Sequence, residues 1–319
     1  MSEKLKAAVV GVGYLGALHA AKYAAHPAVE LVAVFDTDLP RAREVAAGLG
    51  CESAPTLDRL LAGSDLVSVA VPTVEHLKVG LAAASAGVHM LVEKPLAKGT
   101  GEGRRLAQAA DRAGVVLQVG HLERFNPVFD DMRQTVTTPR FIECHRLSPF
   151  AGRGGDTNVV YDLMIHDLDL ISFLVGEKVS SLEAVGVAVV SGEVDIANAR
   201  LRFEGGCTAN VTASRVSLKR ERKLRIFQED AYVSVDFDGR QVRVVRRKPG
   251  SRAAERPMDG ISVEETALES GDPLAVEIAD FIDCVALSRR PTVGAREGME
   301  ALELAERVME SMEIPSLEA

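Results

Sequence analysis

The sequence predicts an α/β protein that combines a doubly wound parallel sheet with a second, α+β domain built on a large, mostly antiparallel open sheet. Over roughly the first 120 residues, short apolar runs alternate with helical patterns. From residue 140 onward, closely spaced strands replace this alternation. At 319 residues the chain is long enough for two cores, and we expect domains at residues 1–121 and 122–319. Whether the terminal helix packs back on the first domain stays open.

The predicted strands of the first domain are continuously apolar, which is typical of a parallel sheet with both faces covered. These strands are Leu5–Val10, Leu31–Phe35, Leu66–Val71, Val88–Val92 and Val115–Val119. The helices between them have apolar residues at helical spacing. These helices are Tyr14–Ala25, Pro40–Leu49, Glu75–Ala86 and Gly101–Ala113.

Composition excludes several classes of protein. The net charge of −9 leaves no basic surplus to neutralise phosphates, so we expect no nucleic-acid partner, although local basic patches remain open. The four cysteines lie far apart and form no CxxC pair, so no disulfide framework and no metal site are predicted. No apolar run is long enough to span a bilayer, and the first residues do not resemble a signal peptide. We therefore expect a cytoplasmic protein with no membrane partner.

A GxGxxG turn, Gly11 to Gly16, connects the first predicted strand to the first helix. Gly11 permits a tight turn, Gly13 lets the backbone approach a pyrophosphate, and Gly16 allows close packing of helix against strand. Free N–H groups at Tyr14, Leu15 and the rest of the first helical turn can bind the anion. The turn therefore predicts a dinucleotide site of the Rossmann type.

Asp36 lies at the end of the second strand, twenty residues after Gly16, where its carboxylate can accept hydrogen bonds from an adenosine ribose. The Asp36-Thr37-Asp38 segment would repel a 2′-phosphate, which favours NAD over NADP. Arg41 and Arg43 are close in sequence and keep NADP as an alternative.

Further polar residues follow the later strands, at the edge where parallel sheets bind ligands. Pro72 and Thr73 follow one strand and should lie beside the cofactor, with Thr73 capping the next helix. His76 is predicted either to contact the cofactor or to be a first-turn surface residue. Glu93 and Lys94 follow another strand; Lys94 should point into the cleft, and its bond to Pro95 is a candidate cis peptide.

Near the middle of the chain, an apolar helix carries Asp162, His166 and Asp169 on one narrow stripe, at about 100° per residue. Because so apolar a helix should be buried, its polar stripe must face partners or a cleft. Taken alone, the stripe fits equally a core histidine satisfied by neighbouring carboxylates.

Taken together and in order, these motifs resemble the Gfo/Idh/MocA oxidoreductase family across essentially the whole chain. The shared motifs are GxGxxG, Asp36, Pro72-Thr73, Glu93-Lys94-Pro95 and Asp162-x-x-x-His166-Asp167. The resemblance implies that Lys94 and His166 flank the reacting carbon of a sugar or polyol, with Asp162 as the supporting carboxylate. It implies NAD-dependent oxidation of a secondary alcohol, with Lys94 or His166 as the principal base. Asp169 is left as a structural residue. Met164-Ile165 stands where the family has glycine before the histidine.

The second domain is predicted to hold strands at Arg140–Leu147, Val179–Val190, Ala197–Phe203, Cys207–Ser214, Lys223–Gln228, Ala231–Phe237 and Gln241–Arg247. A polar loop at Ser251–Asp272 and helices at Leu274–Ser288 and Glu297–Met312 follow them. We expect the Asp162 helix on one face of this sheet and apolar residues on the other. The uncovered face favours a homodimer or homotetramer, as the resemblance also implies.

The segment Gly120–Pro127 is similar to the branch of the family that oxidises the 3-hydroxyl of UDP-N-acetylglucosamine, a step that leads to lipid A or surface polysaccharide. Arg124, Arg153 and the basic run Lys219–Lys223 are candidates to meet a diphosphate. The predicted substrate-binding residues are Lys94, His121, Arg124, Asn126, Arg153, Asp162 and His166. An inositol or other polyol, a free aldose, an NAD-dependent glycosidase and a non-catalytic NAD-binding sensor remain alternatives.

Overall fold

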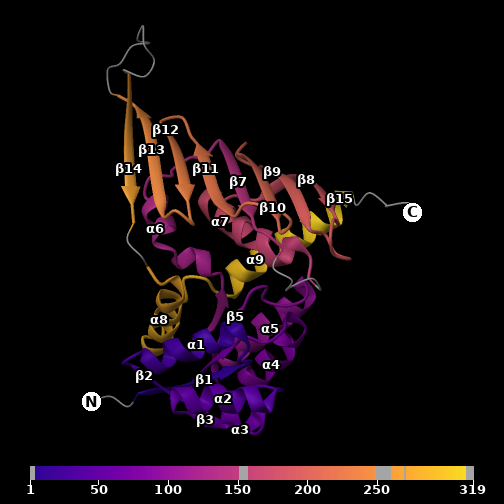
Figure 1. Ribbon diagram of the computed structural model, residues 1–319, viewed down its shortest axis with the longest axis vertical. Coiled ribbons are helices and arrows are strands. Elements are labelled where there is room, and N and C mark those ends of the chain that lie inside the picture. Colours follow the sequence, from indigo (N-terminus) through magenta and orange to yellow (C-terminus); the bar gives the residue numbers. More distant parts are fainter. Residues whose placement is uncertain (1–3, 151–156, 249–259, 269–270, 314–319) are drawn as a thin grey trace. The chain divides into compact units, whose positions relative to one another are not determined.

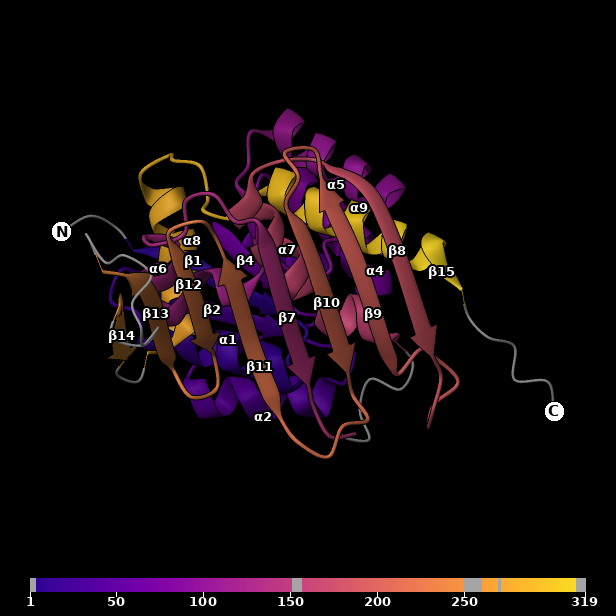
Figure 2. The same cartoon turned by 90° about the horizontal axis from the view of Figure 1, so that it is seen from above.

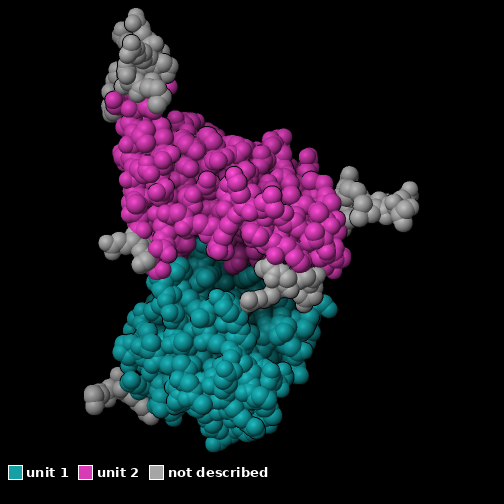
Figure 3. Space-filling view, viewed as in Figure 1, with its two compact units in different colours: residues 1–125, 272–302 teal, residues 126–271, 303–319 magenta. Residues whose placement is uncertain are grey.

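The computed structural model describes residues 4–150, 157–248, 260–268 and 271–313 (Figure 1). The chain divides into two compact units (Figure 3). Unit 1 comprises residues 1–125 and 272–302, and unit 2 comprises residues 126–271 and 303–319. The segment after the large sheet therefore returns to the unit that contains the glycine turn. No helix among the described residues is long and apolar enough to cross a membrane.

Unit 1 is built on a parallel sheet, which confirms the predicted class. Its described strands have the order β3-β2-β1-β4-β5-β6. They are β1 (Leu5–Val10), β2 (Val29–Phe35), β3 (Glu52–Ser53), β4 (Leu66–Val69), β5 (His89–Glu93) and β6 (Leu117–Gly120). The chain runs outward from β1 to β3 and then from β4 to β6, so the direction of winding reverses between β1 and β4. Ligands bind at such a reversal in doubly wound sheets.

Helices cover both faces of this sheet. They are α1 (Tyr14–Ala25), α2 (Leu39–Leu49), α3 (Leu57–Ala62), α4 (Thr73–Ser85), α5 (Thr100–Ala113) and α8 (Pro273–Ala286). Because strand side chains alternate, Leu91 packs with Tyr23 and Phe281 on one face, while Val92 packs with Leu106 on the other. The short elements β3 and α3 were not predicted from the sequence.

Unit 2 contains a sheet of nine described strands in the order β14-β13-β12-β11-β7-β10-β9-β8-β15. They are β7 (Phe141–Leu147), β8 (Val179–Val187), β9 (Ile196–Phe203), β10 (Thr208–Ser214), β11 (Glu221–Phe227), β12 (Ala231–Asp236), β13 (Gln241–Arg247), β14 (Ile261–Ala267) and β15 (Met312–Glu313). The pairs β7–β10 and β8–β15 are parallel and the other pairs are antiparallel, so the mostly antiparallel sheet is confirmed.

The polar loop predicted at Ser251–Asp272 is wrong where β14 lies. The strand Ile261–Ala267 pairs with β13 at the edge of the sheet, and most of its residues are exposed. An edge strand with so little burial lacks the apolar alternation that identifies a strand in the sequence.

Helices cover one face of the unit 2 sheet. Helix α6 (Pro127–Arg133) contacts β12 and β13, and α7 (Ile165–Val175) contacts β7 and β10. The last described helix, α9 (Ala295–Ser311), begins in unit 1 and ends in unit 2, where Arg307 donates to the carbonyl oxygen of Val179.

The opposite face of this sheet carries no described helix (Figure 2). We expected apolar residues there, but much of the face is polar. Arg225 pairs with Glu143 at 3.0 Å between nitrogen and oxygen, and the Asn198 amide donates to Thr212 at 2.8 Å. One apolar cluster on this face consists of Phe141, Phe227 and Tyr232, where the Phe227 ring centroid lies 5.7 Å from that of Phe141 and 4.8 Å from that of Tyr232. Val185 and Val187 of β8 add further apolar surface, at 47% and 38% exposure.

Candidate active site

The glycine turn has the geometry that a dinucleotide site requires. Gly11 has a φ of +83°, and a Cβ there would lie 2.5 Å from the carbonyl oxygen of Ala70. A Cβ on Gly16 would lie 1.8 Å from the carbonyl oxygen of Gly11, so that position also requires glycine. Around Gly13, by contrast, a Cβ would meet nothing within 4 Å. The structure thus packs tightly behind the turn and leaves space at the residue that was predicted to face the pyrophosphate.

Helix α1 starts from this turn with an open N-terminus. Gly13 is the N-cap and supplies no side-chain hydrogen bond, and Tyr14, the first helical residue, is 74% exposed. The positive end of the α1 dipole therefore lies at the turn, where it favours an anion. The residues present fit the diphosphate of a dinucleotide.

Asp36 holds the glycine turn against the end of β2. Its Oδ2 accepts from the backbone N–H of Val12 at 2.7 Å, and its Oδ1 accepts from that of Asp38 at 2.9 Å. Arg41 donates to the carbonyl oxygen of Val12 at 3.2 Å and to Glu44 at 2.8 Å. Because Arg41 is engaged in these two contacts, the charge nearest the predicted ribose position is the Asp36 carboxylate, which fits NAD better than NADP.

The loops after β4 and β5 are joined by His76. This residue is 1% exposed, so the alternative of a surface histidine is wrong. Its Nδ1 lies 2.9 Å from the carbonyl oxygen of Pro95 and its Nε2 lies 2.9 Å from that of Val71. Burial lowers the pKa of His76, and the neutral ring donates to one of the two carbonyls. A contact of His76 with cofactor stays a prediction.

Residues Pro72 and Thr73 stand at the start of α4, with Pro72 at the N-cap and Thr73 as the first helical residue. The expectation that Thr73 caps this helix is therefore wrong. Glu93 is 9% exposed, and its Oε1 lies 3.0 Å from Nε2 of His19. Lys94 follows it, half-buried, and the Lys94–Pro95 peptide is cis.

At the end of β6, His121 lies close enough to Lys94 and Arg124 for their charges to act on it. Burial, followed by the charges of Lys94 and Arg124, lowers the pKa of His121 to about 3. The imidazole is therefore neutral at physiological pH, and His121, Arg124 and Lys94 share one region of unit 1. Both Arg124 and His121 are buried, at 8% and 1% exposure.

In unit 2, Asp162 and His166 lie at the start of the apolar helix, and both are half-buried. The segment Val160–Met164 forms a π-helical turn, and α-helical geometry begins at Ile165. The stripe predicted at 100° per residue therefore does not apply to Asp162. Single π turns inside helices are frequent at functional sites. Asn158 starts the turn by accepting from the N–H groups of Val160 and Tyr161 at 3.1 and 3.2 Å.

A buried ion pair that the sequence analysis missed fixes this helix to the sheet. Arg146 of β7 donates to Asp167 through Nε at 2.9 Å and through a terminal nitrogen at 2.7 Å. Both side chains are nearly inaccessible, at 4% and 2% exposure. Asp167 directly follows His166, so the pair sets the orientation of the helix at that residue. Alternation in β7 places Arg146 among buried residues, which was the available signal.

The remaining predicted substrate residues have different outcomes. Asn126 caps α6, with its Oδ1 accepting from the N–H of Val128 at 3.1 Å. Arg153 lies outside the described residues. In the basic run, Arg220 and Arg222 pair with Asp238 at 3.2 and 3.8 Å. The Asp238 carboxylate neutralises part of the charge that was predicted to attract a diphosphate.

The fold and the glycine turn define a dinucleotide-binding protein with a second, sheet-based domain. Residues 5–121 match the oxidoreductase family with an NAD-binding Rossmann fold, Gfo/Idh/MocA, and residues 133–234 match the Gfo/Idh/MocA C-terminal domain. The chain belongs to the Gfo/Idh/MocA oxidoreductase family, and its cofactor is NAD. This confirms the resemblance, the enzyme class and the cofactor inferred from the sequence.

Individual relatives make the similarity more specific. The chain is 40% identical over 310 residues, 97% of each chain, to UDP-N-acetylglucosamine 3-dehydrogenase from Acidithiobacillus ferrooxidans. A solved structure of that enzyme matches with a TM-score of 0.90 at 38% identity, over 98% of both chains. A scyllo-inositol 2-dehydrogenase (NAD⁺) from Bacillus subtilis is 29% identical and covers 68% of this chain and 69% of its own.

Proposed function

We propose that the chain oxidises the 3-hydroxyl of UDP-N-acetylglucosamine with NAD and releases a 3-keto sugar nucleotide. The observation that carries this proposal is the full-length similarity to UDP-N-acetylglucosamine 3-dehydrogenase, 40% identical over 97% of the chain. The inositol dehydrogenase from Bacillus subtilis is 29% identical over 68% of it. The match to the sugar-nucleotide enzyme therefore covers both domains, and its identity is higher than that of the match to the inositol dehydrogenase.

The residues that carry out this reaction are Lys94, His166 and Asp162. When bound, NAD supplies a hydride acceptor at nicotinamide C4. His166 takes the proton of the hydroxyl as the hydride leaves the same carbon, so the alcohol loses a proton and a hydride and becomes a ketone. Lys94 donates a hydrogen bond to that oxygen and stabilises the developing negative charge. Asp162 holds the imidazole or a neighbouring hydroxyl.

The cofactor residues complete the proposal. Gly11, Gly13, Tyr14, Leu15 and Gly16 cradle the pyrophosphate, and Asp36 binds the adenosine ribose. Pro72, Thr73, His76 and Glu93 line the strand ends beside the nicotinamide. The support comes from the open space at Gly13 and from the Asp36 carboxylate at the end of β2. His121, Arg124, Asn126 and Arg153 are proposed to recognise the substrate.

Purified protein with NAD and a panel of UDP-N-acetylglucosamine, UDP-N-acetylgalactosamine, free N-acetylglucosamine, myo-inositol and scyllo-inositol tests the substrate. We expect NADH absorbance to rise only with the nucleotide sugars, and hydroxylamine to trap a ketone on the sugar of the product. Because hydroxylamine removes the ketone as it forms, the reverse reaction cannot hide a slow oxidation. Faster reduction of NAD by either inositol would contradict the proposal and favour a polyol dehydrogenase.

The product's place in the cell follows from this substrate. A 3-keto sugar nucleotide is an electrophile suited to transamination, so we propose a cytoplasmic role that supplies lipid A or surface polysaccharide synthesis. We also propose that the open face of the unit 2 sheet joins two or four copies, centred on Phe141, Phe227 and Tyr232. Light scattering of the wild type and of Phe227→Glu checks this, with a smaller particle expected for the variant. An unchanged mass would remove this face from the interface.

A further inference from the structure

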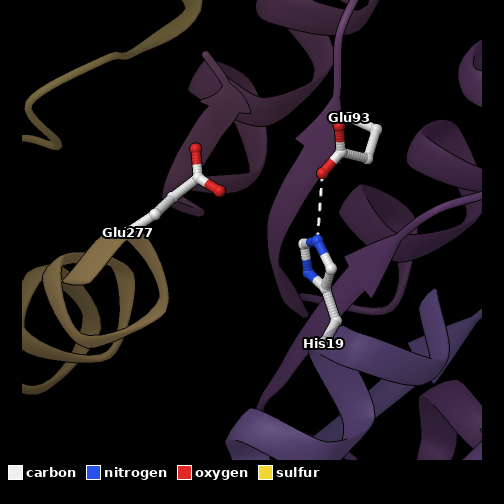
Figure 4. Close-up of side chains that lie close together, drawn as sticks. All are labelled: His19, Glu93 and Glu277. Atoms are coloured by element: carbon white, nitrogen blue, oxygen red, sulfur yellow. Dashed lines mark hydrogen bonds and ion pairs between the residues drawn. The ribbon is translucent and has the colours of Figure 1, made fainter. Parts of the chain in front are cut away.

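A buried polar cluster in unit 1 joins Glu93 to two residues outside the sequence motifs (Figure 4). The cluster consists of His19 of α1, Glu93 of β5 and Glu277 of α8, and one side-chain atom of each lies within 4.8 Å of the other two. His19 is 0% exposed, Glu93 is 9% exposed and Glu277 is 0% exposed. Three elements that are distant in sequence thus bring two carboxyl groups and one imidazole together in a buried place.

The first part of this cluster is a hydrogen-bonded chain. Tyr23 Oη lies 2.8 Å from Oγ of Ser68, and Ser68 Oγ lies 3.0 Å from Nδ1 of His19. His19 Nε2 lies 3.0 Å from Oε1 of Glu93. If Tyr23 donates to Ser68 and Ser68 donates to His19, the imidazole donates its Nε2–H to the Glu93 carboxylate. Every member of this chain then has a partner.

Glu277 is the exception. Its carboxyl group points from α8 toward the His19–Glu93 pair (Figure 4). Within the described residues, neither of its oxygens has a hydrogen-bond partner. Its backbone carbonyl accepts from the Gln118 amide at 3.0 Å, so the helix around it is fixed. A buried ionised carboxylate without a partner costs several kcal/mol, which a stable fold avoids.

The charges around the cluster do not compensate a second carboxylate. In the described part of the chain, neither Glu93 nor Glu277 pairs with a lysine or an arginine. The titratable groups that face Glu277 are His19 and Tyr23 from α1, Glu93 from β5, and Asp280 from its own helix. Two of these are acidic, and like charges that share a buried site cannot both ionise cheaply.

We propose that Glu277 is a neutral carboxylic acid, and that it acts as a positioning residue for the end of β5. Burial raises the pKa of Glu277 well above its usual range, and the charges of Glu93 and Asp280 raise it further. A neutral Glu277 fills the space beside Glu93 without repelling its carboxylate, so Glu93 keeps its contact with His19. The backbone that carries Lys94 therefore keeps its position.

The arrangement favours a proton over a metal ion. His19 and Glu93 are already in direct contact at 3.0 Å, and the three side chains offer three ligands, whereas structural zinc takes four. A proton on Glu277 needs no fourth ligand and leaves the His19–Glu93 contact intact. It also reduces the buried charge by one without any ion having to enter.

Infrared spectroscopy of the full-length protein with Glu277→Gln as the reference tests the protonation state. We expect a carboxylic acid C=O band at neutral pH in the wild type that is missing from Glu277→Gln. The matched control is Asp283→Asn, an exposed carboxylate on the same helix, which should leave the band unchanged. Absence of the band in the wild type would overturn the proposal.

The stability of the same variants gives an independent test. Glutamine is a neutral isostere of the acid, so Glu277→Gln should fold and be at least as stable as the wild type at neutral pH. Near pH 6 to 7, Glu277 keeps its proton in the folded protein and loses it in the unfolded chain. The unfolding equilibrium constant of the wild type should therefore rise about tenfold more per pH unit than that of Glu277→Gln. A Glu277→Gln protein that fails to fold, or that keeps the wild-type pH slope, would contradict a neutral acid.

Metal analysis of the purified protein distinguishes a proton on Glu277 from a metal ion bound by the cluster. We expect less than stoichiometric zinc, manganese, iron or nickel in protein purified without chelator. One ion per chain that is lost in Glu277→Gln would show that a metal ion, rather than a proton on Glu277, occupies the cluster. This result would overturn the proposal.

The positioning role rests on the proposed function of Lys94, and its test is separate. Glu277→Ala leaves an empty space beside Glu93, so kcat should fall by about tenfold or more with little change in the KM for NAD. Glu277→Gln should restore kcat, because its side chain fills the same space without a charge. Equal activity in both variants would remove the positioning role. If the wild type oxidises no sugar, the proposed function fails, while the infrared and stability results still decide the proton.

Discussion

At the scale of single residues, Lys94 owes its position to the groups that fix the backbone around it. His76 contacts the carbonyl oxygen of Pro95 on one side, and Glu93 contacts His19 on the other. Both neighbours are buried, whereas Lys94 itself is half-buried. A charged side chain at the end of an otherwise rigid strand can meet a ligand with little loss of conformational entropy.

Replacing Lys94 or His166 by alanine should lower kcat by about 10² to 10⁴-fold, because each variant removes a group that we propose acts on the reacting oxygen. NAD should bind to both variants with nearly wild-type affinity in calorimetry. Lys98→Ala is the control, since Lys98 is an exposed lysine four residues further along. Near wild-type turnover in both variants would sink the assignment of these residues.

His121 should make the protein sensitive to acid. Its pKa of about 3 in the folded protein lies below the usual 6.5, so below pH 6.5 the unfolded chain binds a proton that the folded protein does not. Stability contributed by the neutral ring is complete above about pH 6.5 and is lost as the pH falls, by up to about 1.4 kcal/mol per unit. Urea unfolding of wild type and His121→Gln at about pH 7 and 5 measures the difference in slope. An equal pH dependence of the unfolding free energy in the two proteins would show that His121 is charged in the folded protein.

At the scale of elements, a buried ion pair helps to hold the helix that carries His166 against the sheet. Arg146 and Asp167 form two short contacts in an environment that excludes water. Such a pair adds little stability over an apolar replacement, but leaving one charge alone is costly. The pair therefore specifies one orientation of the helix against the sheet.

Asp167→Ala should destabilise the protein by about 3 to 5 kcal/mol in urea unfolding, because it removes the carboxylate that Arg146 contacts at 2.7 Å in a buried place. The double variant Arg146→Met with Asp167→Leu should recover most of that loss. Glu265→Ala removes the partner of Arg243 in an exposed pair, at 44% and 53% exposure, and should cost less than about 1 kcal/mol. A double variant as unstable as Asp167→Ala would show that the ion pair itself stabilises the fold.

The elements also show what sequence patterns can and cannot predict. The strands of the parallel sheet were predicted because strands such as Leu66–Val69 are buried on both faces and mostly apolar. The edge strand Ile261–Ala267 is defined by its pairing with β13 and has no such pattern. The π turn at Val160–Met164 depends on tertiary packing, since the sequence alone fits a regular helix.

The candidate site, like the fold, was predicted only in its parts that follow local sequence patterns. GxGxxG, Asp36 and Lys94 belong to local motifs with a known spacing, so the sequence identifies them. Glu277 and Asp167 lie beside residues of other elements, Glu93 and Arg146, and no local pattern predicts such neighbours. The signal available for Glu277 is a charged residue on an apolar helical face, which it shares with Leu274 and Phe281.

At the scale of the whole molecule, unit 1 is discontinuous in sequence. Helix α8 contributes Leu274, Ile278 and Phe281 to the apolar cluster around Tyr23 and Leu91. The segment after α8 also pairs with β6, where the N–H of Val119 donates to the carbonyl oxygen of Val293 at 2.9 Å. One face of the parallel sheet is therefore covered by residues that follow the large sheet in sequence.

A fragment of residues 1–125 should consequently fail to fold cooperatively, because it exposes the sheet face that α8 covers and leaves the β6 edge without its partner. Joining residues 272–302 to this fragment through a flexible glycine-serine linker should restore cooperative thermal unfolding and NAD binding. The matched control carries Phe281→Asp and Ile278→Asp in the joined segment, and should behave as the short fragment does. Cooperative unfolding of residues 1–125 alone, with NAD bound, would show that α8 is dispensable to the dinucleotide-binding unit. Loss of folding in the joined fragment as well would show that unit 1 depends on residues of unit 2.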